Sequence, residues 1–161
     1  MSAERTQPHP MEELLQQLVT CSQALLHSLE AERSALVDRD LDTLADITAD
    51  KLHHTGTLEA LERQRVQLVQ ELGFDNDAAG IRRCLRSLPR AGRLQALWQQ
   101  LLANIRACRN GNLTNGGILE LGRQHVEQAL SVLRGQGGCP ALYGQDGDAA
   151  PRLGQRDLGK A

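Results

Sequence analysis

The sequence predicts an all-α fold, an elongated antiparallel bundle of three long helices and one short helix, followed by a flexible carboxyl-terminal tail. Hydrophobic residues make up 40% of the 161 residues but aromatic residues only 2%, so the core must consist mainly of leucine and alanine, as in packed helices. The five prolines leave residues 11–88 and 90–139 almost free of helix breakers. In both stretches leucines recur at alternating intervals of four and three residues, which is the spacing of one helix face.

The first helix is expected over residues 10–37. The four-three spacing runs through Met11, Leu15, Leu18, Ser22, Leu25, Leu29, Glu32 and Leu36. Residues 37–40 interrupt this spacing, and Asp40 is a suitable N-cap for a second helix because its carboxylate can accept hydrogen bonds from the free amides of the next turn. The second helix should end at Gly73.

The short connection makes the first two helices antiparallel neighbours. Glu32 and Lys51 both fall on the seam between them. Counted from a turn near Arg39 at 1.5 Å per residue, the two positions differ in height by about 9 Å. We therefore expect no direct ion pair between them, and we expect the Lys51 side chain to extend outward.

A short third helix should follow residues 75–77, whose aspartates can cap it, and Pro89 should close it. Its apolar residues are Ile81, Cys84, Leu85 and Leu88. The fourth helix is expected from about Arg90, and its four-three spacing continues to Leu133.

The segment NGNLTNGGILELG, residues 110–122, lies inside the predicted fourth helix although three asparagines and four glycines are poor helix formers. A loop at 110–117 that joins two shorter helices is the alternative, and two Asn-Gly pairs favour it. We favour a continuous helix because the leucine spacing keeps its phase through the segment. Asn112, Asn115 and Gly116 are then expected on the seam, where a buried amide can fix register or oligomeric state and a glycine allows a close neighbour.

Three regions are expected along the chain: a disordered amino terminus (1–9), a helical domain (10–135) and a flexible tail rich in glycine and proline (136–161). Seven of the 15 glycines fall after Arg134, where apolar residues are too sparse to build a core. Tyr143 is the aromatic residue of this tail. Such a tail is either a docking segment or a solubilising one.

Composition and motif spacing argue against several classes of function. A net charge of −2, without a run of lysine and arginine, argues against a nucleic-acid partner. The absence of an apolar targeting segment or a run of 18 apolar residues predicts a cytoplasmic protein without stable membrane insertion. The four cysteines are widely separated and are expected to be reduced thiols. His53, His54 and His125 have no partners at the spacing of a metal or nucleophile site, so we expect no cofactor and no enzymatic activity.

The order of several motifs resembles FlgN-type flagellar export chaperones. Residues 32–36 (ERSAL), residues 38–44 (DRDLDTL) and Lys51 resemble the first half of that family. Residues 112–119 (NLTNGGIL) resemble its N-x-x-N-G-x-hydrophobic segment, and residues 141–147 (ALYGQDG) are similar to its Tyr-Gly segment. The resemblance covers about residues 11–147, and the doubled glycine at 116–117 departs from the single glycine that is usual in the family.

The resemblance implies a cytosolic chaperone that is not an enzyme and that serves flagellar type III export. Such a chaperone binds hook-filament junction (hook-associated) proteins of the FlgK and FlgL type, prevents their premature assembly or degradation, and delivers them to the flagellar export gate. Matched by position, the client-binding residues would be Val126, Ala129, Leu130 and Leu133. Tyr143 would contact the client or the export gate.

Helix geometry alone predicts that some of the aliphatic residues of the fourth helix pack within the protein. Leu119 and Val126 are expected to pack against the first two helices, whereas Leu130 and Leu133 lie beyond the reach of a two-helix partner. The alternative function is a generic coiled-coil adaptor or regulatory subunit that forms a homo-oligomer through the fourth helix.

Overall fold

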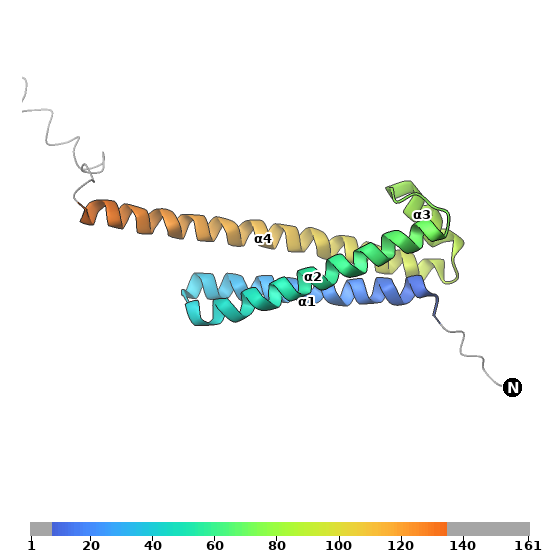
Figure 1. The fold of residues 1–161 in the computed structure, drawn as a ribbon, viewed down its shortest axis with the longest axis horizontal. Coiled ribbons are helices and arrows are strands. Elements are labelled where there is room, and N and C mark those ends of the chain that lie inside the picture. The colour runs from blue at the N-terminus through green and yellow to red at the C-terminus, as the bar shows by residue number, and fades with distance from the viewer. Residues whose placement is uncertain (1–7, 135–161) are drawn as a thin grey trace, which may run out of the picture. The chain divides into compact units, whose positions relative to one another are not determined.

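A computed structural model describes residues 8–134 of the chain (Figure 1). Four helices follow one another, α1 (Pro10–Asp38), α2 (Leu41–Glu71), α3 (Ala78–Ser87) and α4 (Ala91–Leu133), and this part of the chain contains no strand. The predicted all-α class, with three long helices and a short one, is confirmed. The expected tail lies outside the described residues, as does all of the expected disordered amino terminus except residues 8 and 9.

The α1–α2 hairpin is built around the turn that the sequence predicts. Arg39 adopts the left-handed conformation with φ 58°, and the Asp40 carboxylate caps α2 by accepting a hydrogen bond of 3.2 Å from the Thr43 amide. Hydrogen bonds from the Thr43 hydroxyl and the Thr43 amide hold the pKa of Asp40 below its usual value. α2 then runs back along α1 (Figure 1) and is followed by Gly73 at φ 83°, a conformation that glycine adopts without strain.

The main core lies where α1 begins, α2 ends and α3 and α4 meet them. Its buried members are Met11, Leu14, Leu15, Leu18, Val19, Leu61, Val69, Ile81, Cys84, Leu85, Leu94, Leu97 and Leu101. A smaller cluster further along α1 and α4 has three buried members, Leu25, Leu29 and Cys108, with Leu26 and Leu58 partly buried against it. The apolar packing of α4 therefore thins as the helix proceeds.

The buried side chain of Arg65 connects three parts of the helical bundle. The Arg65 side chain is 3% exposed, and its Nε and Nη2 atoms donate hydrogen bonds of 2.8 and 2.6 Å to the Glu62 carboxylate. Nη2 also donates to Oδ1 of Asn76 at 2.8 Å, and the guanidinium lies 5.2 Å from the centre of the Trp98 ring. Charge-assisted hydrogen bonds and a cation–π contact thus join α2, the α2–α3 connection and α4.

Gly80, in the first turn of α3, is a position where only glycine fits. A Cβ atom there would lie 2.1 Å from the Asp75 carbonyl oxygen, which belongs to the backbone and cannot rotate away. We predict that Gly80→Ala lowers the free energy of unfolding by about 1–3 kcal/mol, because the connection before α3 must shift. Urea unfolding followed by circular dichroism measures the change.

Gly92→Ala is the matched control for this prediction. Gly92 is exposed in the first turn of α4, and apart from the adjacent residues and backbone of its own helix no described atom lies within 4 Å of its Cβ position. Alanine should leave stability unchanged or raise it by up to about 1 kcal/mol. Equal effects of the two substitutions would show that the contact with Asp75 is not what requires glycine at position 80.

Candidate functional site

The last part of α4 carries large aliphatic side chains that are exposed to solvent. Leu101, Cys108 and Asn115 are buried, but no residue between 116 and 134 is. The exposed fraction is 60% at Val126 and 82% at Leu133. The exposed large aliphatic residues here are Leu119, Leu121, Val126, Leu130, Val132 and Leu133.

Most of these side chains share one face of the helix. At about 100° per residue, Leu119, Leu130 and Leu133 all point within about 40° of the direction of Val126. Gly122 falls within the same sector and Ala129 on its border, whereas Leu121 points about 140° away. We refer to Leu119, Gly122, Val126, Ala129, Leu130 and Leu133 as the apolar face of α4.

The expectation that Leu119 and Val126 pack against the first two helices is wrong, because both side chains are exposed by more than half. Leu130, Leu133 and Ala129 are exposed as well.

Charged side chains flank the apolar face on one side. Arg123 donates hydrogen bonds of 3.0 and 2.8 Å to the Glu120 carboxylate and also pairs with Glu127, while Gln124 donates to Glu120 at 2.9 Å. The bonds from Arg123 and Gln124 lower the pKa of Glu120, and the bond to Glu120 raises the pKa of Arg123. This segment therefore combines an apolar face with an edge of alternating charge.

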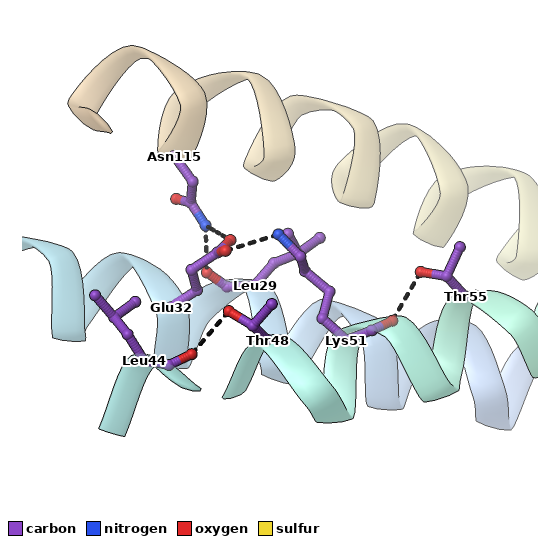
Figure 2. A network of polar contacts seen from close by, with 7 residues as sticks. All are labelled: Leu29, Glu32, Leu44, Thr48, Lys51, Thr55 and Asn115. Carbon is purple, nitrogen blue, oxygen red and sulfur yellow. Dashed lines mark hydrogen bonds and ion pairs between the residues drawn. The ribbon is translucent and has the colours of Figure 1, made fainter. Parts of the chain in front are cut away.

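A buried polar network holds α4 to the hairpin just before the exposed segment begins (Figure 2). The Asn115 side-chain amide donates to the Leu29 carbonyl at 2.8 Å and to Oε2 of Glu32 at 2.7 Å. The other carboxylate oxygen of Glu32 accepts a hydrogen bond of 2.7 Å from Lys51 Nζ. Glu32 is thus the hub that joins α1, α2 and α4.

The direct contact between Lys51 and Glu32 overturns the expectation that Lys51 extends outward. The height estimate ignored the direction of the side chains. Side chains lean toward the amino-terminal end of their own helix. In an antiparallel hairpin, Glu32 therefore leans away from the turn and Lys51 leans toward it, so the two groups close the distance between their backbones.

Of the three residues expected on the seam, only Asn115 lies there. Asn112 and Gly116 are exposed, and no described atom outside the adjacent residues and backbone of α4 lies within 4 Å of the Cβ position of Gly116. The glycine that approaches α1 is Gly111, whose Cβ position lies 3.6 Å from Cβ of Leu29.

The buried stripe narrows along α4. The buried residues of the helix are Leu94, Leu97, Leu101, Cys108 and Asn115, so from Leu101 onward burial recurs only every seven residues. The intervening positions of the four-three pattern are half-buried at Trp98 and Ile105 and exposed at Asn112. A helix whose packing thins along its length buries only the centre of its apolar stripe, and this pattern leaves Asn112 outside.

The sequence analysis also made predictions about metal ligands, cysteines and membrane insertion. Within residues 8–134, no group of three or more histidine, cysteine or acidic side chains is arranged to hold a metal ion. Cys21, Cys84 and Cys108 are free, and burial raises the pKa of all three thiols, which disfavours the reactive thiolate. No helix in the described part of the chain is long and apolar enough to cross a membrane. Tyr143 lies outside the described residues.

Comparisons with known proteins add two findings. The family model described as FlgN protein matches residues 9–151, a range that contains all four helices and Tyr143. Among solved structures, the chain is similar to a flagella synthesis protein FlgN from Pseudomonas aeruginosa, with 26% sequence identity and a TM-score of 0.64, over 74% of this chain and 90% of that chain. No curated protein matches the chain by sequence.

Proposed function

The chain belongs to the FlgN family of flagellar proteins, and from this premise we propose that it is an export chaperone for the hook-filament junction proteins. In this role it binds clients of the FlgK and FlgL type in the cytoplasm, keeps them from assembling or being degraded before export, and delivers them to the flagellar export gate. The role requires reversible binding and no covalent chemistry.

The observation that carries the proposal is the exposed apolar face of α4. Proteins that polymerise through terminal helices bury an apolar stripe on each helix when they assemble, and that stripe needs a removable cover until then. The face from Leu119 to Leu133 offers aliphatic side chains at the spacing with which one helix packs along another. Val126, Ala129, Leu130 and Leu133 are the client-binding residues in this proposal.

The core does not depend on this surface. None of residues 116–134 is buried, whereas the Asn115 side chain is buried and donates to Leu29 and Glu32 within the protein. Because the core takes no buried side chain from residues 116–134, these residues can bind and release a client helix without unpacking the core. Reversible binding is what an export chaperone requires.

The test is complex formation between the full chain and purified hook-filament junction proteins. We expect a defined complex by size-exclusion chromatography with light scattering, and slower limited proteolysis of the terminal helices of the junction protein. A junction protein without its terminal helical segments is the control and should not bind. A chain that self-associates but neither binds nor protects junction proteins would instead be a coiled-coil adaptor.

Tyr143→Ala provides a second, independent prediction. We expect it to weaken docking to the client or to the export gate by about tenfold or more, the effect of removing an aromatic anchor. Helicity and melting temperature should stay unchanged, because the sequence after Arg134 has too few apolar residues to add to the core. Affinity measurements and thermal melts of the variant, with Tyr143→Phe as control, separate the two effects. A clear fall in melting temperature would make Tyr143 a structural residue.

A further inference from the structure

We propose that two client-free copies of the chain pair through residues 119–133 of α4, as an antiparallel dimer whose twofold axis passes beside Val126. The dimer follows from the shape and charge of this segment. Only its consequence, that a client must displace the second copy from the same apolar face, rests on the proposed function. A contiguous row of exposed aliphatic side chains on a soluble helix marks a surface that binds another chain.

The apolar face is complementary to itself in size. When two copies run antiparallel about Val126, residues at equal distances on either side of it meet in one layer. Leu119 then meets Leu133 of the second copy, Gly122 meets Leu130, and Val126 meets its own equivalent. Gly122 leaves room for the larger leucine, since it has no side chain and no described atom beyond the adjacent residues and backbone of α4 lies within 4 Å of its Cβ position. Each layer pairs side chains that fill the space between two helices.

The charged edge is complementary in the same register. Arg123 and Glu127 lie on one side of the apolar face, about 60° and 100° from Val126. In the antiparallel pair, Arg123 of one copy and Glu127 of the second copy lie on the same side and differ in height by about 3 Å. Each dimer therefore gains two opposite-charge pairs, in addition to the pairs that Arg123 makes within its own helix.

A parallel pair lacks both advantages. Equivalent residues of the apolar face would then share a layer, so two glycines at position 122 would leave a gap, and a gap forfeits packing. The charged edges of the two copies would lie on opposite sides of the interface, so Arg123 of one copy and Glu127 of the second copy would not meet. The antiparallel pair closes on itself by twofold symmetry, so association stops at two copies.

Val126→Glu in the full chain tests the position of the twofold axis. Two carboxylates would meet at the axis, so we expect dimerisation in sedimentation equilibrium to weaken at least about a hundredfold. Val132→Glu is the matched control: Val132 is exposed to a similar extent, 65% against 60%, but points about 120° away from Val126. It should change dimerisation less than about threefold. Equal loss in both variants would overturn the proposed register.

A charge exchange tests the orientation of the two helices. Arg123→Glu and Glu127→Arg should each weaken the dimer by about two- to fivefold at low ionic strength, and the double variant should restore it. Failure of the double variant to recover would overturn the antiparallel pairing.

Two further outcomes would overturn the dimer itself. One is a mass of one chain, 17.6 kDa, at every concentration of the unmodified protein. The other is association that appears only when residues 135–161 are deleted, because the tail would then be the segment that covers this face. Since all these measurements are made without a client, a monomer that still binds junction proteins would refute the dimer and leave the proposed function standing.

Discussion

Replacing Glu32 by leucine is expected to lower the free energy of unfolding by about 2–4 kcal/mol. The Glu32 side chain is 7% exposed and accepts hydrogen bonds from both Lys51 and Asn115. Without the carboxylate, the Asn115 amide loses one of its two acceptors in a buried site, and the Lys51 ammonium loses its counterion where it is only 23% exposed. Urea denaturation measures the loss.

We expect this loss because Lys51 and Asn115 keep their polar groups but lose the Glu32 carboxylate, and a set of variants can test this explanation. Glu32→Gln keeps a hydrogen-bond acceptor and should cost less than Glu32→Leu. The triple variant Glu32→Leu, Lys51→Met, Asn115→Leu removes every member of the network together and should recover most of the stability, because apolar side chains of similar volume replace the buried polar set. If the triple variant were as unstable as Glu32→Leu alone, packing rather than unpaired polar groups would explain the loss.

The same network shows which parts of the fold were accessible from the sequence. Pro89, the cap at Asp40, a capping aspartate within residues 75–77 and the glycine at 73 define helix ends, and the structure confirms these ends. The unbroken leucine phase through residues 110–122 predicted one helix, and α4 is continuous there. These features depend on local backbone chemistry and on periodicity, both of which one sequence contains.

Features that depend on three-dimensional packing and on side-chain direction were not accessible. Periodicity identifies which face of α4 is apolar, but it does not reveal that the seam ends at Asn115 and leaves Leu119 and Val126 exposed. The contact between Lys51 and Glu32 depends on side-chain direction, which a count of backbone heights omits. These errors concern residues near Asn115, the last buried residue of α4, and the exposed apolar face follows it in the sequence.

The double substitution Leu130→Glu, Leu133→Glu is expected to weaken client binding by about a hundredfold or more. Burial of one leucine contributes about 1.5–3 kcal/mol, and each 1.4 kcal/mol corresponds to a factor of ten in affinity. The variant loses two such contacts and places carboxylates against an apolar client helix. Stability should change by less than about 0.5 kcal/mol for each substitution, because the side chains are 41% and 82% exposed in the free chain. Isothermal titration of a junction protein into each variant measures the affinity.

Leu121→Glu is the control that distinguishes client binding by one face of α4 from nonspecific hydrophobic binding to any exposed leucine. Leu121 is exposed by 59% on the same helix, but it points about 140° away from Val126. If the client helix lies along the apolar face, Leu121→Glu should bind almost as tightly as the unmodified chain. If the client were held by any exposed leucine of α4, the control would lose affinity as well. A loss confined to Leu130 and Leu133 would therefore assign client binding to one face of α4, since each substitution in both variants replaces an exposed leucine of the same helix by glutamate.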